Sequence, residues 1–98
     1  MLYAIYALDR AGALPARLAA RPEHLARLQQ LADDGRLRLA GPMPQADHGQ
    51  TDAGVAGSLI VAEFASLKDA QDFVDSDPYT AAKVYESVQI RPFRAVLP

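Results

Sequence analysis

Hydrophobic and polar positions along the chain follow two different periodicities. Short runs of apolar and β-branched residues predict strands at residues 3–8, about 36–40, 58–64 and 87–96. Between the first two runs, apolar residues recur every three or four positions, as Leu25, Leu28 and Leu31 do, which predicts an amphipathic helix. With a second helix after the third run, the order is β-α-β-β-α-β. This order predicts a ferredoxin-like α+β fold, with an antiparallel sheet and both main helices on one face.

Glycine and proline define the first helical region and the loop after the second strand. We expect helix across residues 14–34, with Pro22 at the first position of its main helix and Gly35 at its end. Gly41-Pro42 is expected to end the second strand and turn the chain. Glycine, proline and aspartate are frequent in residues 43–57, which predicts a loop.

Hydroxyl and carboxylate side chains mark the starts of two further helices. Residues 66–69 read Ser-Leu-Lys-Asp, the spacing of a helix cap, and predict a helix to about residue 75. Asp77 followed by Pro78 is a favoured helix start, because aspartate accepts from free backbone N–H groups and proline is tolerated at the first helical position. We therefore expect a short helix across residues 78–84.

The first and third strands are apolar on both faces. Between Leu2 and Leu8, both alternating sets of side chains are apolar. Between Ser58 and Phe64, most side chains of both sets are apolar as well. A sheet with one solvated face alternates apolar and polar residues, and two helices cover only one face. We therefore predict a homodimer packed sheet on sheet, with about 10 Å between the sheets. The alternative is that alanine and tyrosine tolerate partial exposure.

Composition restricts the classes of function. The 98 residues suit one domain, spanning residues 1–98. Half of them are apolar but 19 are alanine, so the core is thin, which again favours a partner subunit. A formal net charge of −2 argues against a nucleic-acid-binding surface. The absence of cysteine excludes a thiolate zinc site and a thiol nucleophile.

No export or membrane segment is expected. The apolar residues 1–8 have no basic stretch before them and are followed by Asp9, unlike a signal peptide. No apolar run approaches the roughly 20 residues that span a bilayer. We therefore expect a cytoplasmic protein without membrane contact.

One of the two histidines is a candidate catalytic base. His24 is expected in the first turn of the main helix, beside the apolar stripe that contains Leu28 and Leu31. The positive end of the helix dipole would favour a neutral imidazole there, and a neutral imidazole accepts a proton from a substrate. The alternative is a structural histidine that donates one hydrogen bond to a carbonyl.

Asp77 is the candidate partner of His24. Its carboxylate would fix the imidazole tautomer, and it has enough acceptor positions to cap a helix as well. Capping alone is the alternative. The residues expected to line the substrate pocket lie at strand ends or next to the pair in sequence: Tyr6, Gly41, Pro42, Ser58 and Tyr79.

No metal ion or cofactor is expected. Asp47, His48 and Asp52 are possible ligands, but they lie in the glycine-rich loop. A metal site needs three or four converging ligands on rigid elements, so a solvated loop is favoured. The chain also has no nucleophile elbow, phosphate-binding loop or dinucleotide fingerprint.

Several short segments in a fixed order resemble a known family. They are residues 1–6, 21–28, 34–37, 40–44, 57–58, 62–64, 77–79 and 84–86. Together they resemble the YciI-like family of YCII-related domains over nearly the whole chain, except residues 45–56. The resemblance implies a ferredoxin-like subunit that forms a dimeric α/β barrel, with an active site built on a histidine and an aspartate, here His24 and Asp77. One branch of the family resembles a dehydrochlorinase that acts on a chlorinated hydroxyquinol.

Three functions remain open at this point. The first is a small cofactor-free enzyme that uses His24 and Asp77 on an aromatic or enol-type molecule, in lyase, isomerase or dehydrochlorinase-like chemistry. The second is a module that binds a small ligand in the same pocket without turnover. The third is a domain that serves only dimerisation.

Overall fold

The computed structural model describes residues 1–51 and 54–98 of the chain. Its elements follow in the order β1 (Leu2–Asp9), α1 (Leu14–Asp33), β2 (Leu37–Pro44), β3 (Val55–Glu63), α2 (Leu67–Asp75), α3 (Pro78–Ala81) and β4 (Tyr85–Phe93). None of the described helices is long and apolar enough to cross a membrane. Asp52, one of the loop residues considered as a ligand, lies outside the described residues.

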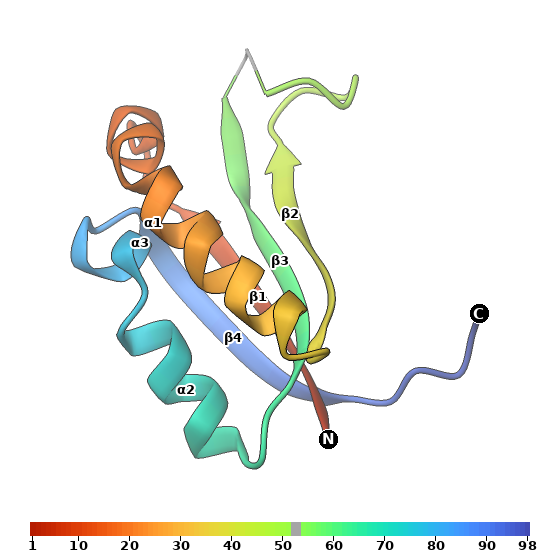
Figure 1. Cartoon of the computed structure of the whole chain (residues 1–98). Helices are drawn as coiled ribbons and strands as arrows, with labels where there is room; N and C mark the ends of the chain where they lie inside the picture. The colour runs from red at the N-terminus through yellow and green to blue at the C-terminus, as the bar shows by residue number, and fades with distance from the viewer. Residues whose placement is uncertain (52–53) are drawn as a thin grey trace.

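The four strands form one antiparallel sheet in the order β2-β3-β1-β4. Helices α1 and α2 lie on the same face of this sheet (Figure 1). The strand order, the antiparallel pairing and the one-sided helix layer confirm the predicted ferredoxin-like α+β fold.

The core lies between the sheet and the two main helices. Ile5 of β1 pairs with Ile60 on one side and Ile90 on the other, so three isoleucines from neighbouring strands form one row on the helix-facing side. Leu28 and Leu31 of α1 pack onto this layer. The two-residue repeat of the strands and the three- to four-residue repeat of the helix therefore meet in a single apolar layer.

Helix α1 is continuous through Pro22, and the prediction that Pro22 starts the main helix is wrong. Pro22 has no N–H to donate to the carbonyl of Leu18, and the ribbon of α1 changes direction between its first turns and the rest (Figure 1). His24 consequently lies roughly three turns after the start of α1. The helix dipole acts within the first turn, so it does not act on His24 as expected.

The predicted end of α1 and the predicted starts of α2 and α3 are confirmed by their caps, but α3 ends at Ala81 rather than at residue 84, because Lys83 takes a φ of 56° that ends the helix. Gly35 follows α1 with a φ of 73°, a conformation that glycine adopts without strain. The Ser66 hydroxyl accepts from the N–H of Asp69 at the start of α2. The Asp77 carboxylate accepts from the N–H of Tyr79 at the start of α3. These caps fix where the chain enters and leaves each helix.

Strand β2 is longer than predicted and runs through Gly41-Pro42 without a turn. Pro42 pairs with Ser58 of β3. Because β2 is an edge strand, its outer side has no neighbouring strand, and proline is tolerated at such a position. The connecting loop is correspondingly shorter than residues 43–57, since β3 begins at Val55.

The face of the sheet opposite the helices is also apolar over much of its area. Tyr6 pairs with Leu59, and Val61 pairs with both Ala4 and Leu39, so these side chains share that face. Tyr6 is 43% exposed and Leu39 is 51% exposed. Two large apolar side chains on one sheet face are therefore in contact with solvent in the isolated subunit.

Gly57 of β3 lies against the backbone of Ala7 in β1, and we predict that Gly57→Ala destabilises the fold. A Cβ at this position would overlap the carbonyl oxygen of Ala7. The overlap should lower the free energy of unfolding by about 1–3 kcal/mol, measured by urea denaturation. Gly41→Ala is the matched control, because no described atom lies within 4 Å of that Cβ. Equal stability of the two variants would contradict this account.

Candidate functional site

The side chains of His24 and Asp77 meet between α1 and the start of α3. The imidazole Nδ1 lies 2.9 Å from Oδ1 and 3.0 Å from Oδ2 of the carboxylate, and both side chains are buried. A carboxylate is an acceptor only, so Nδ1 carries the proton and donates it. This leaves Nε2 as the acceptor nitrogen, and no described residue forms a hydrogen bond with it.

Two further donors hold the Asp77 carboxylate. The backbone N–H of Tyr79 donates to Oδ1 at 2.8 Å, and Nη1 of Arg27 donates to Oδ2 at 3.1 Å. Arg27 itself is fixed by the carbonyl of Phe73 and the hydroxyl of Ser76, and its guanidinium lies 4.2 Å from the centre of the Phe73 ring. The carboxylate that orients His24 is therefore immobilised from both α1 and α3.

Aromatic stacking fixes the plane of the imidazole. The ring of Tyr79 is stacked on that of His24, with centroids 3.8 Å apart and planes 13° apart. The rings of Tyr79 and Tyr85 form a T-shaped pair with centroids 5.8 Å apart. Burial raises the pKa of Tyr79, although the nearby Arg17 guanidinium opposes this shift. Burial and the Asp77 carboxylate raise the pKa of Tyr85, so both phenols stay neutral over the physiological pH range.

A buried ion pair lies on the other side of Tyr79. Arg17 donates from Nε and Nη2 to the two oxygens of Asp9, both at 2.8 Å, and from Nη2 to the Ser58 hydroxyl at 2.8 Å. Burial alone lowers the pKa of Arg17, but the hydrogen bonds and charge of Asp9 outweigh it and raise the pKa above its ordinary value. The positive charge of Arg17 is therefore already neutralised within the protein.

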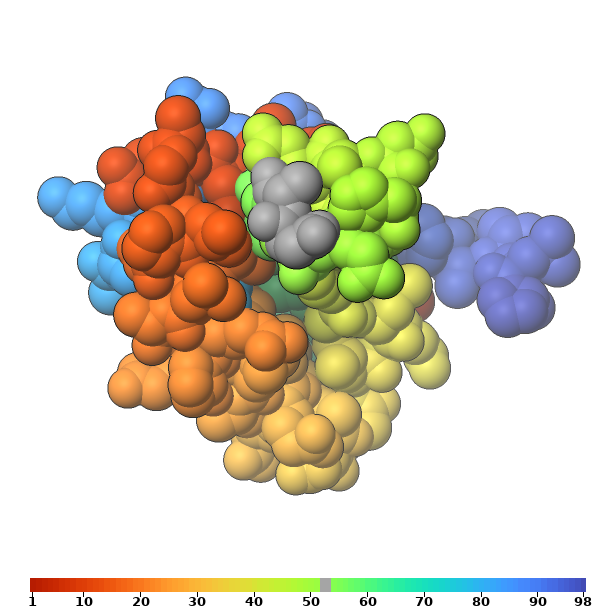
Figure 2. All heavy atoms as spheres, turned by 90° about the horizontal axis from the view of Figure 1, so that it is seen from above, coloured from red at the N-terminus to blue at the C-terminus, as the bar shows by residue number. Residues whose placement is uncertain are grey.

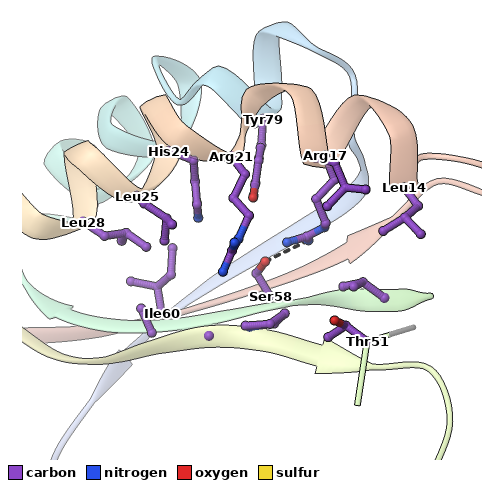
Figure 3. Close-up of a pocket in the computed structure, with 15 residues that line it drawn as sticks. Leu14, Arg17, Arg21, His24, Leu25, Leu28, Thr51, Ser58, Ile60 and Tyr79 are labelled. Carbon is purple, nitrogen blue, oxygen red and sulfur yellow. Dashed lines mark hydrogen bonds between the residues drawn. The ribbon is translucent and has the colours of Figure 1, made fainter. Parts of the chain in front are cut away.

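His24 and Ser58 open onto a cavity of about 590 Å³ between α1 and strands β2 and β3. Figure 2 shows the surface hollowed between the spheres of α1 and those of β2. In Figure 3 the far nitrogen of the His24 ring points into this cavity. The lining residues are Leu14, Arg17, Leu18, Arg21, His24, Leu25, Leu28, Ala40, Gly41, Pro42, Thr51, Val55, Ser58, Ile60 and Tyr79.

Of the five residues expected to line the pocket, Gly41, Pro42, Ser58 and Tyr79 do so, and Tyr6 does not. Tyr6 is wrongly placed by the sequence interpretation because neighbouring strand residues point to opposite faces. Ser58 is on the helix-facing side, so Tyr6, which pairs with the adjacent Leu59, is on the opposite side. The Tyr6 side chain therefore lies on the face of the sheet opposite the helices.

Three arginines of the site were missed in the sequence interpretation. Arg17, Arg21, His24 and Leu28 are spaced by four, three and four residues, which places them on one face of a continuous helix. Starting the main helix at Pro22 separated the first two residues from this face. Arg27, three positions after His24, contacts the same aspartate. A helix that continues through Pro22 would have placed Arg17 and Arg21 on the same face as His24.

His48 lies in the described part of the loop between β2 and β3. Its Nδ1 accepts from the backbone N–H of Gln50 at 3.1 Å. Within residues 1–51 and 54–98, no group of three or more His, Cys, Asp or Glu side chains converges as a metal site would require.

Comparison with known proteins places the site in context. A model of the YCII-related domain matches residues 1–94. Protein YciI of Escherichia coli O6:H1 is 56% identical over 97 residues, which cover 98% of this chain and 99% of the relative. An uncharacterized protein of Haemophilus influenzae is 44% identical over 97 residues, which again cover 98% of this chain and 99% of the relative.

One solved structure is similar over nearly its full length. It is 5-chloro-2-hydroxyhydroquinone dehydrochlorinase (TftG) from Burkholderia phenoliruptrix AC1100, in complex with 2,5-dihydroxybenzoquinone. The TM-score is 0.86 at 31% sequence identity, and the match covers 96% of this chain and 94% of that chain. The fold described above is therefore shared with a protein that binds a small ring compound.

The raised pKa of Tyr85 predicts how stability depends on pH. In the unfolded chain tyrosine ionises near pH 10, so above this pH the unfolded state releases a proton that folded Tyr85 retains. The free energy of unfolding should therefore fall as pH rises past about 10, and Tyr85→Phe should fall less steeply, by up to about 1.4 kcal/mol per pH unit. Urea unfolding at several alkaline pH values measures both slopes. Equal slopes would show that Tyr85 does not contribute.

Proposed function

The chain belongs to the family of YCII-related domains, and on this premise we propose that it is an acid–base enzyme acting on a small aromatic or enol-type molecule. One observation carries the proposal. His24 is immobilised by a buried carboxylate on its Nδ1 side, while its Nε2 faces a cavity of about 590 Å³. An imidazole held in this way is oriented to exchange a proton with a bound molecule.

The residues around His24 supply the features that a general base needs. When Nε2 takes a proton, the imidazole becomes positively charged, and the Asp77 carboxylate at 2.9 Å stabilises that charge. Stacking on Tyr79 keeps the ring in one orientation during the transfer. Positioned acid–base catalysis of this kind typically contributes roughly 10²- to 10⁴-fold in rate.

The cavity suits a small ring compound. Its volume lies within the range of about 300–1,000 Å³ that is typical of small-molecule sites, and its walls are mainly apolar with a few polar groups. The similar dehydrochlorinase binds 2,5-dihydroxybenzoquinone, which supports an elimination for this chain too. In such a step His24 removes a proton, the released electron pair forms a double bond, and the leaving group departs with its bonding pair.

A substrate panel with matched variants tests this function. We expect wild-type protein to turn over at least one halogenated or hydroxylated ring compound, with chloride release or absorbance as the readout. His24→Gln should lower kcat at least about 100-fold. Asp33→Asn is the control, because Asp33 is exposed at the end of α1. Two outcomes would overturn the enzyme proposal. One is turnover by His24→Gln at the wild-type rate, and the other is saturable binding without turnover by wild type and both variants.

The Asp77→Asn variant tests the pair independently of any substrate. A carboxamide can donate to Nδ1, so the imidazole proton should move to Nε2. Nitrogen-15 NMR of the ring distinguishes the two tautomers, and we expect a switch from Nδ1–H in the wild type to Nε2–H in the variant. The same tautomer in both proteins would show that Asp77 does not orient His24.

We also propose that two copies of the chain pack through the open faces of their sheets. That face presents exposed Tyr6 and Leu39 together with Leu59 and Val61, and β1 and β3 at its centre are apolar on both sides. A second copy supplies a complementary apolar sheet by two-fold symmetry, and two four-stranded sheets then form a barrel-like dimer. Burial of this face stabilises the thin, alanine-rich core.

Leu39→Glu should dissociate this dimer. Each subunit of a two-fold dimer would place one carboxylate in the apolar interface. Unpaired charges are costly to bury. Leu67→Glu on α2 is the matched control, because Leu67 and Leu39 are both 51% exposed but lie on opposite sides of the molecule. Sedimentation equilibrium should give a dimer for wild type and Leu67→Glu and a monomer for Leu39→Glu. A monomeric wild type would refute the dimer.

A further inference from the structure

The cavity beside His24 carries an excess positive charge. Its described lining contains two arginines and no carboxylate. Arg17 is neutralised by Asp9, as shown by two hydrogen bonds of 2.8 Å. Arg21 has no ion pair and no hydrogen bond with any described residue. Among residues 1–51 and 54–98, the cavity therefore holds one guanidinium whose charge no carboxylate pairs with.

Arg21 is placed to meet a ligand. Figure 3 shows its side chain descending from α1 into the cavity between His24 and Arg17, with the guanidinium nitrogens toward Ser58 and Ile60. Leu25, Leu28 and Ile60 form an apolar wall on the same side. Arg21 is an exposed residue of the cavity lining, and the planar fork of its guanidinium matches two oxygens of an anion.

The ion pair between Arg17 and Asp9 keeps a negative charge out of the cavity. Had Asp9 been directed into the cavity, its carboxylate would have repelled an anionic ligand. Instead, both of its oxygens accept from Arg17, and only 4% of its side chain is exposed. The Ser58 hydroxyl, which accepts from Arg17, is a further polar group at the cavity floor.

We propose that Arg21 is a specificity-determining residue that selects planar substrates with an ionised oxygen, either a carboxylate or an enolate. This inference rests on the proposed function, since it takes the His24 cavity as the substrate site. The ionised oxygen binds the Arg21 guanidinium, and the ring lies against Leu25 and Leu28 with its reacting hydrogen toward Nε2 of His24. Neutral compounds of the same shape lack the ionic contact and bind more weakly.

Two pairs of probes separate charge from shape. Benzoate and benzamide have the same planar outline but differ in charge, and 2,5-dihydroxybenzoquinone and its dimethyl ether differ in an ionisable enol. Titration followed by amide NMR shifts gives Kd for each probe. We expect wild type to bind at least one anion about tenfold more tightly than its neutral partner. The pair that shows this preference identifies the oxygen as carboxylate or enolate.

Variants assign the preference to Arg21. Arg21→Gln should abolish it, Arg21→Lys should retain part of it, and Arg94→Gln, which removes an equal charge outside the cavity, should leave it unchanged. The backbone amide spectrum confirms that each variant is folded. Equal binding of anion and neutral partner by wild type, no anion binding at millimolar concentration, or an intact preference in Arg21→Gln would each overturn the inference.

The His24→Gln variant separates this inference from the proposed enzyme activity. If Arg21 selects anions, His24→Gln keeps the anion preference even when no compound is turned over. If instead turnover depends on His24 while Arg21→Gln retains the preference, the enzyme proposal stands and the role of Arg21 is refuted.

Discussion

The carboxylate of Asp77 is the group on which the organisation of the site depends. It starts α3 by accepting from Tyr79, orients His24 through Nδ1, and holds Arg27. A buried carboxylate is costly unless its acceptor positions are filled, and here donors from two helices fill them. The hydrogen bonds that compensate the buried carboxylate therefore also fix the direction in which the imidazole points.

A second buried charge follows the same rule at the other end of the cavity. Arg17 lies inside the protein because Asp9 and Ser58 satisfy its donors. Between the two networks lies the ring of Tyr79, stacked on His24 and 4.7 Å from the Arg17 guanidinium carbon. The polar groups of these networks at the border of the cavity thus have hydrogen-bond partners within the protein, whereas no described residue is a hydrogen-bond partner of Nε2 of His24 or of the guanidinium of Arg21.

The sequence predicted the fold and the two residues of the pair better than it predicted their surroundings. Strand alternation and helix caps depend on neighbouring residues, so they can be read locally, as Ser66 and Asp77 illustrate. Tyr6 was misplaced because its face depends on which register the strand adopts. Arg17 and Arg21 were missed because Pro22 was taken as a boundary, although α1 continues through it. Arg27 was missed because its contact with Asp77 joins two helices that are far apart in the sequence.

Pro22 divides the wall formed by α1 into two segments with separate anchors. The segment before it bears Arg17, which is tied to β1 through Asp9, and the segment after it bears His24, which is tied to α3 through Asp77. Pro22 follows Arg21 directly, and the hydrogen bond that it cannot donate to the Leu18 carbonyl falls between these anchors. Because the two anchored segments form one wall of the cavity, the angle between them at Pro22 bears on the width of the space left for a ligand.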